Sequence, residues 1–122
     1  MTLRRIRLEL ARCPEYPEGS RDHGYEFVAP LDAKGHFDAK EWKAAQEKCT
    51  VRRFWAGQDD EDGKLIHHRG NHWVFSYDPD PAETADDEPI FRFDRHLFKE
   101  GEYVSITEHD GVQRPFRVAT VR

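Results

Sequence analysis

The stretch that decides the fold lies near the start of the chain and reads Arg5-Ile6-Arg7-Leu8-Glu9-Leu10. Apolar and charged residues alternate along it with a period of two, which is the pattern of a β-strand with one buried face. Ile6, Leu8 and Leu10 should therefore point into a core, while the residues between them face solvent. We expect this strand to begin near Arg4.

Similar short stretches follow along the 122-residue chain and predict seven or eight strands, with a loop over residues 13–24. Turns separate them, which favours antiparallel pairing over parallel βαβ units. The predicted strands cover residues 25–31, 50–56, 64–68, 72–77 and 90–93, and two further arms surround residues 104–106 and 116–118. Pro30 cannot donate to a ladder, so the first of these strands should either end there or lie on an edge of the sheet.

The aromatic content is high, with 8 Phe, 4 Tyr and 3 Trp, whereas only 37% of the residues are hydrophobic. We therefore expect a small core built on large rings. The length is that of one domain. The sequence thus predicts a single mainly β domain over residues 1–122, formed by a curved antiparallel sheet or a small partly closed barrel with one short helix.

The one predicted helix spans Ala39–Lys48. Asp38 is a candidate N-cap, and Glu41 three residues later completes the arrangement of a capping box. Phe37 before the cap and Trp42 in the helix fit a hydrophobic staple. Apolar residues recur at helical spacing from Trp42 onward, so this face should lie on the sheet.

The hairpin at residues 64–77 has two plausible registers. A Gly70-Asn71 turn would pair Ile66 with Phe75, whereas an Arg69-Gly70 turn would pair Ile66 with Trp73. Both registers bring apolar residues together, and the first has the better turn residues.

A second hairpin is predicted near the end of the chain. A two-residue turn would place the apolar side chains of its arms on opposite faces. A three-residue loop, His109-Asp110-Gly111 with Gly111 in the left-handed conformation, places Val104 opposite Phe116 instead. Burial therefore favours the three-residue loop.

The net charge of −5 is unevenly distributed, because residues 59–62 and 78–88 hold ten acidic residues and no basic one. Segment 78–89 also contains three prolines and no bulky apolar residue before Ile90, so we expect a mobile acidic loop there. The rest of the chain is mildly basic. This division favours solubility, and it is also compatible with a basic face for a polyanion.

Several classes of protein are excluded by composition. No apolar run approaches the roughly 18 residues of a membrane span, and the first ten residues lack the apolar core of a signal peptide. Cys13 and Cys49 are too few for a disulfide scaffold or a four-cysteine zinc site. We therefore expect a cytoplasmic domain without a membrane partner.

The sequence contains no catalytic constellation. Its serines lie outside any G-x-S-x-G elbow, and its glycines form no phosphate-binding loop. Cys49 falls at the C-terminal end of the predicted helix, where the helix dipole disfavours a thiolate. We therefore expect no catalytic residue and no cofactor, and we do not expect an enzyme.

Three histidines are candidate metal ligands, namely His67, His72 and His96. Neutral imidazoles bind zinc, copper or nickel well. His67 would oppose His72 directly only in the register with the Arg69-Gly70 turn. No short sequence motif predicts a third ligand. The simpler interpretation is that these histidines lie at turns on the surface and bind no metal.

Two stretches interleave bases with rings, and within them Arg53, Trp55, Arg92 and Phe93 are candidate binding residues. On a strand such a pattern can stack bases and contact phosphates of single-stranded nucleic acid. A strand with an aromatic core face and an arginine solvent face has the same pattern. The overall acidity favours this second interpretation.

Segments 101–111, 25–31 and 52–55 together resemble a family of hypothetical bacterial proteins of similar length. The resemblance implies no activity, cofactor or ligand residue. The sequence thus favours a non-enzymatic cytoplasmic binding or accessory module, whose partner is a protein or small ligand. Binding of single-stranded nucleic acid is the alternative hypothesis, and a histidine metal site is a second one.

Overall fold

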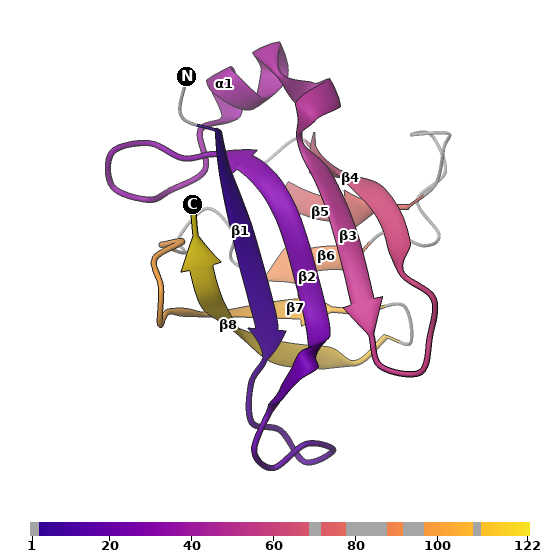
Figure 1. Cartoon of the computed structure of the whole chain (residues 1–122). Helices are drawn as coiled ribbons and strands as arrows, with labels where there is room; N and C mark the ends of the chain where they lie inside the picture. Colours follow the sequence, from indigo (N-terminus) through magenta and orange to yellow (C-terminus); the bar gives the residue numbers. More distant parts are fainter. Residues whose placement is uncertain (1–2, 69–71, 78–87, 92–96, 109–110) are drawn as a thin grey trace.

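The computed structural model describes residues 3–68, 72–77, 88–91, 97–108 and 111–122. Within these residues the chain forms eight strands, one short α-helix and one 3-10 helix (Figure 1). The strands are β1 (Leu3–Leu10), β2 (Ser20–Pro30), β3 (Thr50–Trp55), β4 (Glu61–His68), β5 (His72–Ser76), β6 (Glu88–Phe91), β7 (Tyr103–Thr107) and β8 (Gln113–Val121). The helix α1 spans Ala39–Ala44, and the 3-10 helix η1 spans Gln46–Lys48.

Each strand pairs antiparallel with the next one along the chain, and β8 pairs with β1, so the sheet closes into a barrel. The predicted mainly β architecture, a curved antiparallel sheet with one short helix, is confirmed. The β1–β2 loop and the β3–β4 turn lie at one end of the barrel, which we call the loop end; α1 lies at the opposite end, the helix end (Figure 1). No helix in the described part of the chain is both long and apolar enough to cross a membrane.

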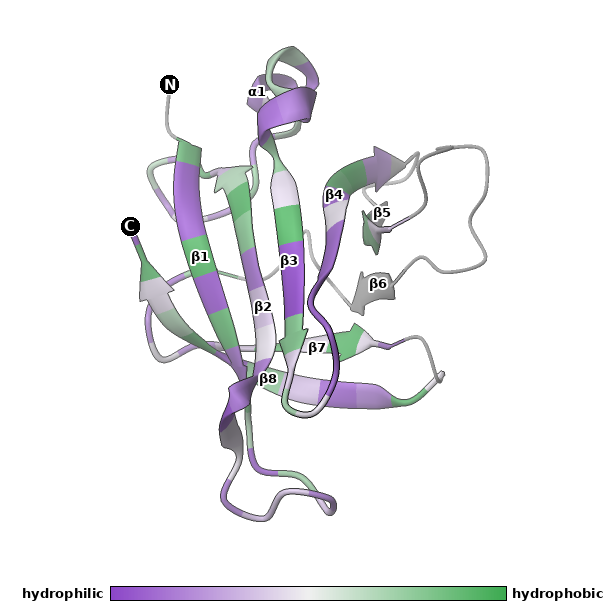
Figure 2. Cartoon of the chain, turned by 45° about the vertical axis from the view of Figure 1, so that its right-hand side comes forward, coloured by the Kyte–Doolittle hydropathy of each residue, from purple (hydrophilic) through white to green (hydrophobic). Residues whose placement is uncertain are grey.

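The alternation predicted for β1 is present in the structure. Ile6 and Leu8 are completely buried and Leu10 is nearly so, whereas Arg5 is exposed. Figure 2 shows the resulting alternation of hydrophilic and hydrophobic bands along β1. The strand therefore presents one face to the interior and one to solvent, as a half-buried strand requires.

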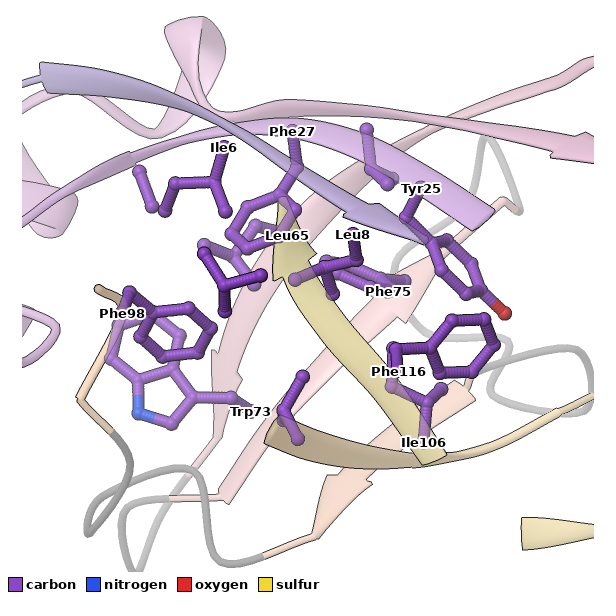
Figure 3. Packing of buried hydrophobic residues seen from close by; sticks show 14 of the residues in the cluster. Ile6, Leu8, Tyr25, Phe27, Leu65, Trp73, Phe75, Phe98, Ile106 and Phe116 are labelled. Carbon is purple, nitrogen blue, oxygen red and sulfur yellow. The ribbon is translucent and has the colours of Figure 1, made fainter. Parts of the chain in front are cut away.

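The interior is filled by rings, as the composition predicts (Figure 3). The largest completely or almost completely buried side chains include Trp73, Tyr25, Phe27, Phe75, Phe98 and Phe116. Many of these rings meet edge to face, for example Tyr25 with Phe116 at 5.2 Å between centroids and Phe27 with Phe98 at 6.0 Å. Such contacts are the preferred geometry of aromatic pairs.

The helix is shorter than predicted. The Asp38 carboxylate caps it, accepting from the backbone N–H groups of Lys40 and Glu41 at 3.1 Å each. However, Ala45 leaves the helical conformation with φ −131°, and its N–H bonds back to the Trp42 carbonyl. The prediction of one helix over Ala39–Lys48 is therefore wrong. The tighter η1 turn follows and leads the chain into β3.

The predicted loop over residues 13–24 is partly wrong, because β2 already begins at Ser20. Gly24 belongs to this strand and pairs with Phe54 of β3. A Cβ atom at Gly24 would strike the Leu8 carbonyl oxygen and come within 3.0 Å of the Phe54 ring. Glycine is thus required by the close approach of neighbouring groups, and not by a turn.

The β4–β5 hairpin adopts neither of the two registers considered. Leu65 pairs with Phe75, Ile66 with Val74, and His68 with His72, so three residues separate the arms. Leu65 and Phe75 are both completely buried. Either two-residue turn would put these two side chains on opposite faces, and burial therefore selects the intermediate register.

The β7–β8 hairpin follows its prediction. Val104 pairs with Phe116, and Gly111 has a φ of 79°, in the left-handed region. The strand expected at residues 90–93 is displaced, since β6 begins at Glu88 and residues 92 and 93 lie outside the described residues. Most of the expected acidic loop, residues 78–87, also lies outside them.

Candidate functional site

Arg53 and Trp55 lie on the inward face of β3, near the loop end of the barrel. Arg53 is only 7% exposed, and its guanidinium carbon lies 4.3 Å from the centre of the Trp55 ring. Arg53 and Trp55, both predicted to contact a ligand, are thus stacked on each other. Their predicted companions, Arg92 and Phe93, lie outside the described residues.

The partner of Arg53 is a carboxylate that the sequence analysis did not single out. Glu108 follows β7 and is 3% exposed. Its Oε2 accepts from Arg53 Nη2 at 3.0 Å and from the Tyr25 hydroxyl at 2.8 Å, and its Oε1 accepts from Arg114 Nη1 at 2.8 Å. One buried carboxylate therefore holds two guanidiniums and a phenol.

The β1–β2 loop closes this arrangement from outside. Glu15 accepts from Arg114 Nε at 2.8 Å and from Nη2 at 3.2 Å, a two-pronged contact of the kind that arginine makes with carboxylates. We call Glu15, Tyr25, Arg53, Glu108 and Arg114 the interior ion-pair cluster. Arg53, Glu108 and Arg114 are its buried ions, and the exposed Glu15 side chain supplies the second carboxylate at the surface.

The cluster keeps Arg53 charged. Burial by itself lowers the pKa of Arg53, but the contacts with Tyr25 and Glu108 raise it more, so the net shift is upward. Because the guanidinium has its partners inside the protein, it is not presented to a ligand in solution. The cluster is suited to tying β2, β3, β7 and β8 together.

Beside the cluster, His23 lies between two hydroxyl groups. Its Nδ1 is 2.5 Å from the Ser20 Oγ, and its Nε2 is 3.2 Å from the Tyr16 hydroxyl. The ring also contacts Trp55 edge to face at 4.4 Å. Burial lowers the pKa of His23, which favours the neutral ring.

Hydrolytic triads contain a serine–histidine pair, but the pair of Ser20 and His23 lacks the carboxylate that completes a triad. In a triad the second ring nitrogen contacts a carboxylate, whereas here it faces the Tyr16 hydroxyl. His23 is also 6% exposed, so a substrate would have little access to it. The arrangement is that of a structural hydrogen-bonded pair.

Of the three predicted metal ligands, His67 is the one whose side chain the structure describes. His67 packs between the Trp42 and Trp73 rings, with centroids 5.7 and 4.3 Å away. His67 pairs across the hairpin with Trp73, and not with His72 as a shared site would need. His96 and the side chain of His72 lie outside the description, and the described residues contain no group of three potential ligands.

The outer surface of the barrel carries a second polar arrangement, centred on Arg7. Its guanidinium donates to Glu9 Oε2 and to Glu26 Oε1, both at 2.9 Å, and lies 4.4 Å from the centre of the Phe54 ring. Glu26 in turn accepts from Arg52 at 3.0 Å. These contacts cross β1, β2 and β3, and Glu26 links the two guanidiniums.

Further arginines surround this network on the outer surface, and most are exposed. We call the whole set the arginine face; it consists of Arg5, Arg7, Arg12, Arg21, Arg52, Arg117 and Arg122. Its members line three shallow hollows, one between β1 and β4, one beside the end of β8, and one at the β1–β2 loop. Glu9 and Glu26 lie within the face, and five exposed acidic residues lie at its margins, namely Glu18, Asp22, Asp60, Asp62 and Glu100.

Lysines are concentrated elsewhere than the arginines. Four of the six, Lys34, Lys40, Lys43 and Lys48, belong to the segment between β2 and β3, which contains α1, whereas Lys64 lies on β4 and Lys99 precedes β7. Arginine binds phosphate and carboxylate groups in a planar, two-pronged manner, whereas lysine acts as a hydrated point charge. The concentration of arginine on one face is therefore the feature most suggestive of binding.

The sequence does contain a signal for the interior ion-pair cluster. Arg114 is in phase with the buried Phe116 and Val118, and Glu108 is in phase with Val104 and Ile106. A charged residue on the apolar side of an alternating strand predicts a buried ion with a partner.

Comparison with known proteins adds no relative. No protein-family model matches the chain, and neither a curated protein nor a solved structure matches it.

Proposed function

We propose that the protein is a non-enzymatic binding module of the cytoplasm that takes an anionic partner on the arginine face. The observation that carries this proposal is the exposure of most of these arginines together on one side of the barrel. The guanidiniums are the groups best suited to phosphate and carboxylate ligands.

The interior of the barrel supports an external site. Small barrels either enclose a ligand or fill their interior with side chains. Here the interior holds Tyr25, Phe27, Phe75 and Phe116, all at most 1% exposed. The interior ion-pair cluster occupies the loop end. A ligand would therefore bind outside, where the hollows of the arginine face lie.

The network around Arg7 supports a function in binding rather than in solubility alone. Glu26 bridges Arg7 and Arg52, and Glu9 lies 2.9 Å from Arg7 and 4.0 Å from Arg117. Arginines that are fixed before binding lose less conformational entropy when a ligand arrives.

Titration with inorganic polyphosphate tests the proposal. We expect binding that weakens as salt increases, because each neutralised phosphate releases counterions. The double variant Arg5→Ala/Arg122→Ala should bind more weakly and with a smaller salt dependence. The matched control is Lys40→Ala/Lys43→Ala, which removes the same charge at the helix end.

Two results would contradict the proposal. Absence of binding by the wild-type protein at low salt would show that the face does not take a polyanion. Equal losses in the two double variants would show that net charge matters and that the arginine face does not.

A further inference from the structure

Of the three hollows of the arginine face, the one at the β1–β2 loop combines three arginines with an exposed aromatic side chain. Its volume is about 640 Å³, and it is lined by Arg12, Arg21, Arg117 and Tyr103, together with Glu9 and Glu18. This volume lies within the range of about 300–1,000 Å³ that is typical of ligand sites. An aromatic side chain therefore shares one hollow with three guanidiniums.

Tyr103 is unusual among the aromatic residues of this protein. It is 59% exposed, whereas nearly all other described rings are buried or half-buried. It pairs across β7 and β8 with Arg117, and Arg117 pairs with Glu9 of β1. Tyr103, Arg117 and Glu9 thus form a row across the outer surface, at a spacing of about 4.8 Å per strand.

We infer that this hollow binds single-stranded nucleic acid, with Tyr103 as the platform on which a base stacks. The inference rests on the proposed function and names the ligand class of the arginine face. Exposed rings next to cations are what single-strand-binding surfaces use, because every base has a π-face and every nucleotide a phosphate. Tyr103 supplies a ring for the base, and the neighbouring Arg117 supplies a cation for the phosphate.

The charge balance of the hollow favours phosphate. Glu9 lies 2.9 Å from Arg7 outside the hollow and 4.0 Å from Arg117 within it, so three arginines and two glutamates line the hollow. Arg12 and Arg21 form no ion pair with a described residue. Arg21 also accepts from Arg7 through its carbonyl at 3.0 Å, which joins the hollow to the Arg7 network. Glu18 is the second acidic residue in the lining.

A single strand fits this surface better than a duplex. The bases of a duplex are stacked on each other and do not offer a face to Tyr103. Duplex readers commonly insert a helix into the major groove. The helix α1 lies at the opposite end of the barrel from this hollow (Figure 1).

The test is a fluorescence anisotropy titration of the full chain with a labelled oligothymidylate of about 20 nucleotides, between about 50 and 200 mM salt. Tyr103→Ala should weaken binding at least about fivefold while keeping the salt dependence, and Tyr103→Phe should retain binding. Arg117→Ala should lower the slope of log K against log salt by about 0.7. Val112→Ala, an exposed apolar position elsewhere, is the matched control for Tyr103→Ala.

The outcomes separate this inference from the proposed function. If polyphosphate binds through the arginine face but Tyr103→Ala leaves oligothymidylate binding unchanged, the inference is wrong and the proposed function stands. A duplex, or an acidic peptide, that binds as tightly as the oligothymidylate also overturns the inference. If neither polyphosphate nor oligothymidylate binds, both proposals fail.

Discussion

Arg53 Nη2 lies 3.0 Å from Glu108 Oε2 inside the barrel, although 55 residues separate the two in the sequence. Arg53 comes from β3 and Glu108 from the end of β7, on different parts of the barrel wall. Their contact is possible only because the sheet curls until these strands face each other. Burying two ions is costly, so each depends strongly on the presence of the other.

Glu108→Gln should destabilise the protein by about 3–5 kcal/mol, because it leaves Arg53 and Arg114 buried without their shared carboxylate. Equilibrium unfolding in urea measures this loss. Glu102→Gln, an exposed position next to β7, is the control and should change stability by no more than about 0.5 kcal/mol. Similar small losses in both variants would show that the cluster does not contribute to stability.

His23 should make stability depend on pH near neutrality. Burial lowers the pKa of His23 in the folded protein below the ordinary value of 6.5, so the unfolded chain takes up this proton first. The stabilisation is therefore complete above about pH 6.5 and is lost as the pH falls through this value toward the folded pKa. Urea midpoints between about pH 7.5 and 5 should fall less in His23→Gln than in wild type; parallel curves would contradict the assignment.

The helix cap and the docked ring should contribute different amounts. Asp38→Ala removes the acceptor for two backbone N–H groups and should cost about 0.5–2 kcal/mol. Trp42→Ala should cost about 3–5 kcal/mol, because this 7% exposed ring also donates to the Leu65 carbonyl at 2.9 Å. Denaturant melts measure both losses, with Lys40→Ala as the surface control. Negligible losses in both variants would mean that α1 is not docked on the barrel.

The two thiols should differ in reactivity. Cys49 is completely buried, and burial raises the pKa of its thiol to about 11. In the Cys13→Ala variant, iodoacetamide at neutral pH should therefore leave the native protein unmodified and should label it once urea unfolds it. Mass spectrometry detects the adduct. Rapid labelling of the native variant would show that Cys49 is accessible.

Local patterns determined much of the fold. The alternation around Ile6 and Leu8, the Asp38 cap and the three-residue loop before Val112 all depend on residues close together in the sequence. The patterns that predict them are therefore readable in a short window of the chain, although the burial that they imply is completed only by the folded barrel. The same windows predicted an aromatic core and a mainly β domain, and both predictions are confirmed.

Register and helix length depended on contacts beyond such windows. The β4–β5 hairpin adopts the register that buries Leu65 with Phe75, although the turn residues favoured the register with a Gly70-Asn71 turn. The helix stopped at Ala44, and the chain then turned through η1 into β3. Turn and helix propensities amount to about 1 kcal/mol or less per residue, whereas burying a large apolar side chain is worth about 1.5–3 kcal/mol.

The candidate site shows the same division most clearly. Arg52 and Arg53 are chemically identical neighbours, and the sequence analysis took Arg53 as the candidate binding residue. In the barrel Arg52 faces outward to Glu26, whereas Arg53 faces inward to Glu108. Alternation along a strand determines that neighbours point opposite ways, but only the closed sheet decides which side is the interior and which distant carboxylate lies there.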